Sequence, residues 1–421
     1  MNMEYQEGKL RVGFIGLGGR GQGILDLILD MDDIEVSAVC DCYEDRAQKG
    51  VEIVQKKRDY APVPYTNYKE LLKRDDVDVV LSPSSWTSHA DVAIASMKAG
   101  IPVGFEVGGA TSIQQCWDLV HTAEETGVSC SMLENCCYGR EELLVLNMVK
   151  KGLFGEIIHC QGGYQHDLRE EIDCGVENRH YRIDNYSHRN GELYPTHELG
   201  PVSKVLNINR GNRYLTLTSM STKARGLNQW ALDHKGPENK WATYPFPQGD
   251  VVTTMIKCAN GESIVLVHDT SLPRPYSRNG RVQGTKGIWS EDKNGIFIDG
   301  RSPQKGWDHE WEPMANFQDE YDHPLWKEFV VDGVKGGHGG MDWLVLRGFL
   351  ESVKNKTTPP IDIYDSVAWM SITCLSEDSI AMGSQPVPVP DFTNGKWIKR
   401  EPIVRGKYCL DDICEECFRK Y

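Results

Sequence analysis

No stretch of the chain approaches the roughly 18 consecutive apolar residues that a helix needs to cross a bilayer. Positive charge is also scarce, because 46 Lys and Arg stand against 61 Asp and Glu, for a formal net charge of −15. Nucleic acids and anionic membranes are bound by clustered cations, so we expect neither as a main partner. Internal repeats and low-complexity tracts are missing as well. These absences favour an ordinary soluble globular protein.

The cysteines do not form the pattern of a disulfide framework. There are 13, an odd number, and several lie inside apolar runs, as Cys40 and Cys160 do. The N-terminus, MNMEYQEGKL, lacks the apolar stretch of a signal peptide. We therefore expect reduced thiols and a cytoplasmic protein, with a trimmed exported form left open. Cys414 and Cys417 resemble half of a zinc site, but no second pair follows, so we expect no metal.

The first third of the chain alternates between strand-like and helix-like segments. The pattern predicts strands at 11–15, 35–40, 77–81, 102–105 and 129–133, with helices at 21–29, 91–98 and 113–123. Such alternation implies a parallel sheet wound by right-handed crossovers. A length of 421 residues favours two domains. We assign residues 1–137 to a Rossmann dinucleotide-binding domain.

The remainder of the chain changes character. Strand-like runs dominate between a helix at 141–150 and two late helices, and they lie at 157–164, 214–220, 251–258, 263–268 and 296–298. Asn260-Gly261 predicts a hairpin with a type I′ turn, and 385–390 predicts an extended strap. The whole is an α/β protein in which residues 138–421 form an α+β domain on a large, mainly antiparallel sheet. An open sheet face often mediates self-association, so we expect a homo-oligomer.

The strongest single motif lies in residues 12–21, VGFIGLGGRG, which place Gly16, Gly18 and Gly21 in the spacing G-x-G-x-x-G. The motif follows a predicted strand and opens a helix, and Asp41 ends the next strand 20 residues later. That context is typical of dinucleotide binding, with the phosphates at the helix N-terminus. Asp41 would accept the ribose hydroxyls and repel a 2′-phosphate, which favours NAD over NADP.

Two further segments end predicted strands at the same edge of this sheet. Ligands of open α/β sheets bind beyond the carboxyl ends of the strands. The segment 82–89, SPSSWTSH, should therefore border the cofactor, and Glu106-Val107 ends the next strand in the same rim. For His89 two roles stay open, a contact with the cofactor or a cap of the following helix.

A second group of chemically active residues lies in 188–201, HRNGELYPTHELGP, a segment without apolar periodicity. A histidine near neutral pKa suits proton removal from a sugar or alcohol hydroxyl, so His197 beside Tyr194 is a candidate base. Tyr164 in QGGYQHDLR and Tyr276 in SLPRPYS are flanked by turn formers. We expect both tyrosines to point into a cleft.

Longer blocks of sequence resemble a known family. The glycine motif, the Glu106-Val107 strand end and the sheet-forming second half resemble the glucose–fructose oxidoreductase and inositol dehydrogenase superfamily. More narrowly, the chain resembles glycoside hydrolase family 109 between about residues 10 and 380, in blocks such as LENCCYGREELLVLNMVKKGLFGEIIHCQGGYQHDLRE, HRNGELYPTHELGPV, SMSTKARGL, HDTSLPRPYS and GGHGGMD.

That family is known for NAD-dependent α-N-acetylgalactosaminidases, so the resemblance implies a redox route to glycoside cleavage. Tightly held NAD+ takes hydride from C3 of the sugar, and the resulting ketone acidifies the C2 proton. A base then removes this proton and the C1 substituent leaves by elimination. Water adds at C1, C2 is reprotonated, and NADH returns the hydride, so the cofactor is recycled. Such chemistry needs only proton carriers from the protein.

The resemblance also implies which residues contact each ligand. The implied NAD contacts are Gly16, Gly18, Arg20, Gly21, Asp41, Trp86, Thr87, Ser88, His89, Glu106, Val107 and Asn135. The implied sugar contacts are Tyr164, Arg182, Tyr194, Pro195, Thr196, His197 and Tyr276. We expect His197 to act as base at the 3-hydroxyl, with Tyr164 or Tyr194 carrying the C2 proton.

One departure from the superfamily bears on the reaction. Glu106-Val107-Gly108 stands where Glu-Lys-Pro is usual, so the customary lysine is absent, and the pair Gly108-Gly109 predicts a looser loop. Two other readings stay open. The first is a sugar 3-dehydrogenase that releases a ketosugar, and the second is a non-catalytic NAD-dependent sugar sensor.

Overall fold

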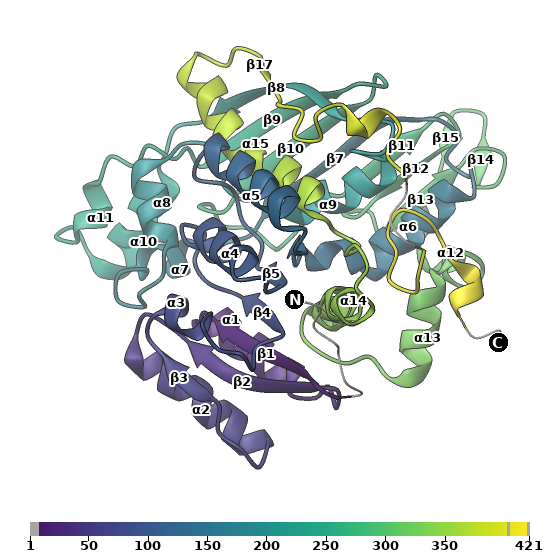
Figure 1. Cartoon of the computed structure of the whole chain (residues 1–421). Coiled ribbons are helices and arrows are strands. Elements are labelled where there is room, and N and C mark those ends of the chain that lie inside the picture. Colours follow the sequence, from purple (N-terminus) through teal and green to yellow (C-terminus); the bar gives the residue numbers. More distant parts are fainter. Residues whose placement is uncertain (1–7, 402–404, 419–421) are drawn as a thin grey trace.

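Two β-sheets organise the chain, one formed by its first third and one by the remainder (Figure 1). The computed structural model describes residues 8–401 and 405–418. Every strand pair of the first sheet is parallel, whereas the second sheet contains a single parallel pair, β7 with β10, among antiparallel ones. The α/β fold class predicted from the sequence is confirmed.

The first sheet has the strand order β3-β2-β1-β4-β5-β6. Its strands are β1 Leu10–Ile15, β2 Ile34–Cys40, β3 Val63–Tyr65, β4 Val79–Ser82, β5 Val103–Phe105 and β6 Cys130–Met132. Successive strands extend in one direction from β1 to β3 and in the other from β4 to β6. The order therefore reverses between β1 and β4, and ligands of such sheets bind at the carboxyl ends of the strands there.

Helices connect these parallel strands. They are α1 Gly19–Ile28, α2 Glu44–Lys57, α3 Tyr68–Leu71, α4 His89–Lys98 and α5 Ile113–Thr126. Helix α5 shows how the sequence sets such bounds. The Ser112 hydroxyl accepts a hydrogen bond from the Gln115 N–H at 3.2 Å, and Gly127 ends the helix in the left-handed region at φ 66°.

The second sheet has nine strands in the order β16-β13-β12-β11-β7-β10-β9-β8-β17. They are β7 Ile157–Gln165, β8 Tyr214–Ser221, β9 Val251–Cys258, β10 Ser263–Asp269, β11 Arg281–Gly284, β12 Gly287–Ser290, β13 Gly295–Ile298, β16 Glu312–Pro313 and β17 Val387–Pro388. A separate hairpin joins β14 Gln304–Lys305 to β15 Asp308–His309.

The predicted hairpin between β9 and β10 forms, but the predicted turn type is wrong. A type I′ turn needs positive φ at both central residues, and only Gly261 has it, at 106°. The Cys258 N–H donates to the Glu262 carbonyl at 2.9 Å, and the Gly261 N–H donates to the Cys258 carbonyl at 3.2 Å. The loop therefore has three residues, with glycine at the single left-handed position.

Helices cover the inner face of the second sheet and fill the space between the two sheets (Figure 1). The helical elements of this part are η1 Asn135–Tyr138, α6 Arg140–Lys150, α7 Arg169–Asp173, α8 Arg182–His188, α9 Thr196–Val205, α10 Gly226–Lys235, α11 Lys240–Thr243, α12 Ala315–Tyr321, α13 Pro324–Asp332, η2 His338–Gly340, α14 Met341–Asn355, α15 Ile363–Ala381, η3 Lys396–Ile398 and η4 Glu415–Cys417. Among residues 8–401 and 405–418, we find no helix with the length and apolar character needed to span a bilayer.

Helix α14 comes late in the sequence but packs on the first sheet. A Cβ on Gly104 of β5 would lie 2.9 Å from the Phe349 ring, so the glycine makes room for this contact. The Arg347 guanidinium pairs with Asp33, just before β2, at 2.8 Å. As a result, the N-terminus of α14 lies beside α1 and the glycine-rich turn.

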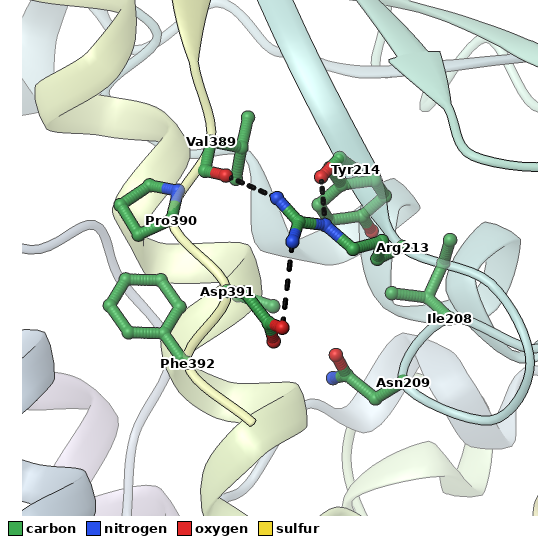
Figure 2. Close-up of a pocket in the computed structure, with 9 residues that line it drawn as sticks. Ile208, Asn209, Arg213, Tyr214, Val389, Pro390, Asp391 and Phe392 are labelled. Atoms are coloured by element: carbon green, nitrogen blue, oxygen red, sulfur yellow. Dashed lines mark hydrogen bonds and ion pairs between the residues drawn. The ribbon is translucent and has the colours of Figure 1, made fainter. Parts of the chain in front are cut away.

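The segment predicted as an extended strap pairs with the edge of the second sheet as β17. Figure 2 shows how Arg213 holds it across a small pocket. The Arg213 guanidinium donates to the Val389 carbonyl at 2.8 Å and to the Tyr214 carbonyl at 3.1 Å, and it pairs with Asp391 at 3.5 Å. The pocket is thus part of the packing of this edge.

Candidate active site

The glycine-rich turn after β1 has the geometry of a phosphate cradle. Gly16 has φ 106°, and a Cβ there would lie 2.6 Å from the Pro83 carbonyl oxygen. A Cβ on Gly21 would lie 2.1 Å from the Gly16 oxygen, so the third glycine lets α1 pack on β1. Among the described residues, a Cβ on Gly18 would have only the Arg46 guanidinium within 4 Å, at 3.8 Å. The turn is therefore closely packed at Gly16 and Gly21 and has open space at Gly18, as a dinucleotide site requires.

Asp41 directly follows β2 and lies beside this turn. Its carboxylate is buried and accepts hydrogen bonds from the Leu17 N–H at 2.7 Å and the Tyr43 N–H at 3.0 Å. The Cys42 thiol also donates to it, at 3.7 Å. A carboxylate has about four acceptor positions, so these three contacts still leave capacity for a ribose hydroxyl. The predicted role of Asp41 fits its position.

Arg20 does not offer a free charge to a phosphate. Its guanidinium donates to Glu106 at 3.0 Å and to both carboxylate oxygens of Asp342 at 2.7 and 2.8 Å. Burial alone would raise the pKa of Asp342, but the Arg20 and His338 side chains hold it well below its usual range. Asn135 donates to the same carboxylate at 2.7 Å. At the expected phosphate position, the donors that remain are the N–H groups in the first turn of α1 and the Arg46 guanidinium beside Gly18.

The rim segment 82–89 places Trp86 at the meeting point of the two domains. The indole is buried against Tyr181 and Tyr194, with ring centroids 4.9 and 5.6 Å away. A Cβ on Gly108 would lie 2.4 Å from the indole, and one on Gly109 would lie 2.0 Å from the Thr373 hydroxyl. The prediction of a looser loop at this glycine pair is wrong, because close packing requires both glycines.

The other polar residues of the rim divide between packing and hydrogen bonding. The His89 ring is buried, lies 3.0 Å from the Ser84 carbonyl through Nε2, and has its pKa lowered by burial to about 4. This neutral, inward-facing imidazole favours the structural role that the sequence left open. Thr87 and Ser88 bond through their hydroxyls to Ser85 at 3.1 Å. The Val107 N–H, which is buried, donates to Glu106 at 3.0 Å.

His197 lies in the first turn of α9, where the buried residues Pro195 and Thr196 begin the helix. Its Nδ1 lies 2.8 Å from a carboxylate oxygen of Glu134, which is wholly buried just after β6. Burial alone would raise the pKa of Glu134, but the interaction with His197 outweighs it, so the pKa is lowered. Glu134 thus fixes the tautomer and orientation of the imidazole and leaves Nε2 for chemistry.

The predicted tyrosines fall into two separate hydrogen-bonded pairs. The Tyr194 hydroxyl lies 3.5 Å from His197 Nε2, while the Tyr164 hydroxyl lies 3.1 Å from His166 Nδ1. The two tyrosine rings are in contact, with centroids 4.4 Å apart. Tyr276 is 48% exposed and packs edge-on to Tyr164 and His166 at the outer side of the group.

Arg182 is the cation of this group. It is buried, and its Nε lies 2.6 Å from Glu171. Its guanidinium carbon lies 5.0 Å from the Trp86 ring, 5.4 Å from Tyr194 and 6.0 Å from Tyr164. The structure therefore brings the predicted sugar contacts and the predicted cofactor rim together around Trp86.

The 174–181 loop also ties the second domain to the nucleotide side of the first. The Arg179 guanidinium forms two hydrogen bonds with Asp45, at 2.7 and 2.9 Å, and lies 4.4 Å from the Tyr43 ring. Arg46 donates to the Asn178 carbonyl at 2.9 Å. Asp45 and Arg46 belong to the first turn of α2, shortly after Asp41, so these contacts lie beside the expected ribose position.

Glu134, Cys136 and His197 form a group that the sequence did not predict, with ligand-type atoms within 4.8 Å of one another. The Glu134–His197 hydrogen bond already uses one atom of each side chain. An Arg278 guanidinium nitrogen lies 3.7 Å from the Cys136 sulfur. A positive charge at that distance opposes the binding of a metal cation by this group.

Solved structures share this architecture. An NAD-binding oxidoreductase from Klebsiella pneumoniae superposes with a TM-score of 0.69 at 16% identity, covering 91% of this chain and 99% of that one. A levoglucosan dehydrogenase in complex with NADH and levoglucosan gives a TM-score of 0.69 at 15% identity, with 91% and 100% covered. Residues 10–134 also match the model of the oxidoreductase family with an NAD-binding Rossmann fold. The chain therefore contains an NAD-binding Rossmann domain.

The second domain gives the narrower assignment. Residues 138–399 match the C-terminal domain of glycosyl hydrolase 109. An α-N-acetylgalactosaminidase from Tannerella forsythia is 41% identical over 419 residues, covering 94% of this chain and 89% of the relative. A glycosyl hydrolase family 109 protein from Stenotrophomonas maltophilia is 43% identical over 426 residues, with 95% and 93% covered. The chain belongs to glycoside hydrolase family 109 and is a glycosidase similar to α-N-acetylgalactosaminidase.

Proposed function

We propose that this protein cleaves α-N-acetylgalactosaminides by oxidation of the sugar at C3, elimination between C1 and C2, addition of water and re-reduction. The observation that carries the proposal is the meeting of a dinucleotide cradle and two tyrosine–histidine pairs around Trp86. The relative from Tannerella forsythia supports the choice of sugar.

NAD, when bound, supplies the reversible oxidation at C3. The glycine-rich turn can accommodate its phosphates, because the turn is closely packed at Gly16 and Gly21 but leaves open space at Gly18. The Trp86 indole nitrogen supports the same reading, since it is buried without a hydrogen-bond partner in the part of the chain that the structure describes. Asp41 would bind the ribose hydroxyls, and Glu106, Val107 and Asn135 would lie beside the nicotinamide ring.

His197 acts in this proposal as the base at the 3-hydroxyl. Its Nδ1 is engaged by Glu134 at 2.8 Å, so Nε2 is the atom that receives the proton. The buried carboxylate stabilises the imidazolium that results, because opposite charges attract strongly where water is excluded. The Tyr194 hydroxyl lies 3.5 Å from His197 Nε2 and is the second polar group at the 3-hydroxyl.

The C2 proton then falls to Tyr164 rather than to Tyr194. Tyr194 already shares its hydroxyl with His197, whereas the Tyr164 hydroxyl bonds to a different histidine. Arg182 lies over both rings and would orient the substrate's polar groups. The proposed steps need one proton acceptor for the C3 hydroxyl and another for the C2 hydrogen, and the two tyrosine–histidine pairs provide them.

A direct test uses 4-nitrophenyl α-N-acetylgalactosaminide with purified protein and no added NAD. The proposal expects release of 4-nitrophenol together with intact N-acetylgalactosamine over many turnovers. Loss of bound NAD by acid treatment should abolish release, and added NAD should restore it. A ketosugar product with a need for continuous NAD supply would overturn the proposal in favour of a sugar 3-dehydrogenase. Sugar binding without any turnover would favour a sensor.

A further inference from the structure

We propose that His166 is a proton-relay residue that connects Tyr164 with solvent when the C2 proton leaves the sugar. The inference rests on the proposed function and deepens it, because it names the route by which that proton exchanges. His166 acts through Tyr164 and is therefore a positioning residue for the reaction.

The backbone holds the two side chains on one face. Tyr164 lies near the end of β7, and His166 follows the strand two residues later, so both side chains project to the same side. The His166 N–H donates to the Asp269 carbonyl at 2.9 Å, which continues the pairing of β7 with β10. The resulting distance between the Tyr164 hydroxyl and His166 Nδ1 is 3.1 Å.

Solvent exposure increases from Tyr164 through His166 to Tyr276. Tyr164 is only 7% exposed, His166 is half-buried, and Tyr276 beside it is 48% exposed, with its ring centroid 5.1 Å from that of His166. Within residues 8–401 and 405–418, His166 Nε2 has no hydrogen-bond partner. The imidazole therefore lies between a buried phenol and the outer side of the site, with one nitrogen for each.

The protonation states suit a relay. Burial raises the pKa of Tyr164, with Arg182 as a smaller opposing effect, so the phenol keeps its proton at neutral pH. Such a phenol can accept the C2 proton only if its own proton departs. Burial and the charges of Arg182 and His197 lower the pKa of His166, against Glu171 and Asp167, which raise it. His166 is thus a neutral base at pH 7, and it loses this capacity as pH falls.

Removal of the C2 proton needs no reactant besides the ketosugar, the two side chains and water. The C2–H bond of the ketosugar breaks and its electron pair forms the C1–C2 double bond. The C1–O bond breaks with its electron pair on the leaving-group oxygen, which takes a proton from water or, in the 4-nitrophenyl substrate, departs as the phenolate. The C2 proton arrives on the Tyr164 oxygen while the original phenol proton moves to His166 Nδ1. The Nε2 proton passes to water. Reprotonation of C2 after water addition reverses the same path.

The test compares His166→Asn with the wild type in deuterated buffer. Asn keeps an acceptor near the position of Nδ1 but cannot pass a proton on. Removing a positioned acid–base group typically costs about 10²-fold or more, so we expect kcat to fall by about that factor with KM little changed. The acidic limb of the kcat–pH profile should also change, because the contribution of His166 to it is lost. Oxidation at C3 should persist, so near-ultraviolet absorbance of reduced nicotinamide should accumulate.

Two further variants separate a relay from a structural role. His166→Ala should regain activity with added imidazole, which supplies the missing proton carrier. His234→Asn is the control, because that exposed histidine stacks on Trp230 in α10. Near-normal kcat with an unchanged pH profile in His166→Asn would overturn the relay. So would a loss of C3 oxidation in this variant as large as its loss of turnover. Absence of C2 deuterium in the wild type would instead overturn the proposed function itself.

Discussion

The substitution Glu134→Gln isolates the charge that supports His197. The Glu134 oxygen that lies 2.8 Å from His197 Nδ1 also accepts from the Cys136 N–H at 3.1 Å. Because two donors face this oxygen, the amide introduced by the substitution should keep its carbonyl oxygen there and preserve the imidazole tautomer. Only the negative charge is then lost, and the imidazolium that forms when His197 takes a proton loses its counter-charge.

The size of the effect follows from that difference. Hydrogen bonds to charged groups contribute about 1.5–3 kcal/mol, and about 1.4 kcal/mol corresponds to a tenfold change in rate. We therefore expect kcat/KM to fall roughly 10- to 150-fold. The assay is initial-rate release of 4-nitrophenol at pH 7, with bound NAD and circular dichroism checked for each preparation.

Glu192→Gln provides a matched control. Glu192 is also a wholly buried glutamate, and it lies near Tyr194, whose N–H donates to it at 3.4 Å. Burial raises the pKa of Glu192 to about 8, so the carboxyl is largely protonated at pH 7 and the amide changes no charge. Wild-type activity in Glu134→Gln, or an equal loss of activity in Glu192→Gln, would contradict the role given to the Glu134 charge.

Three other consequences can be measured. Arg179→Ala removes the two hydrogen bonds to Asp45 that close the second domain over the nucleotide side, so dissociation of NAD should become several-fold faster in a dialysis assay. Gly108→Ala places a Cβ 2.4 Å from Trp86, so calorimetry should show a loss of about 1–3 kcal/mol in unfolding free energy, with reduced activity. Glu192 keeps its proton in the folded state above the pH at which the unfolded chain releases it. Its contribution to stability should therefore fall as pH rises from about 4.5 to about 8, and Glu192→Gln should flatten this decline in urea titrations.

The first two of these substitutions have matched controls. Lys49→Ala removes an exposed ion pair to Glu52 on α2 without touching the second domain, and its NAD dissociation should match the wild type. Gly23→Ala adds a methyl group to open space on α1 and should not destabilise the protein. NAD loss at the wild-type rate in Arg179→Ala, or a Gly108→Ala protein as stable as Gly23→Ala, would contradict the corresponding account.

The nucleotide site could be predicted from the sequence because its determinants are local. Gly16, Gly21 and Asp41 fall within one strand–helix–strand unit, where backbone sterics and strand direction fix their positions. The same holds for the elements themselves, since α5 carries its own cap and its own terminal glycine. The turn at 260–261 was predicted less well, because an Asn-Gly pair suits more than one loop length.

The surroundings of His197 and Arg20 could be predicted only in part, because residues distant in sequence complete them. Glu134 is 63 residues from His197 in sequence, and Asp342 is 322 residues from Arg20. Neither pairing has a local pattern. A signal did exist for Glu134, a polar residue directly after a strand at the carboxyl edge of the sheet. His166 had one too, since spacing of two along a strand places it beside Tyr164.

In the proposed reaction, the glycosidic bond breaks through loss of the C2 hydrogen while NAD stays with the protein. Hydrolysis of 4-nitrophenyl α-N-acetylgalactosaminide in deuterated buffer without added NAD, with the released sugar read by NMR, tests it most directly. We expect deuterium at C2 of the N-acetylgalactosamine released by the wild type. Release of the sugar with hydrogen fully retained at C2 would contradict it and indicate direct hydrolysis at C1.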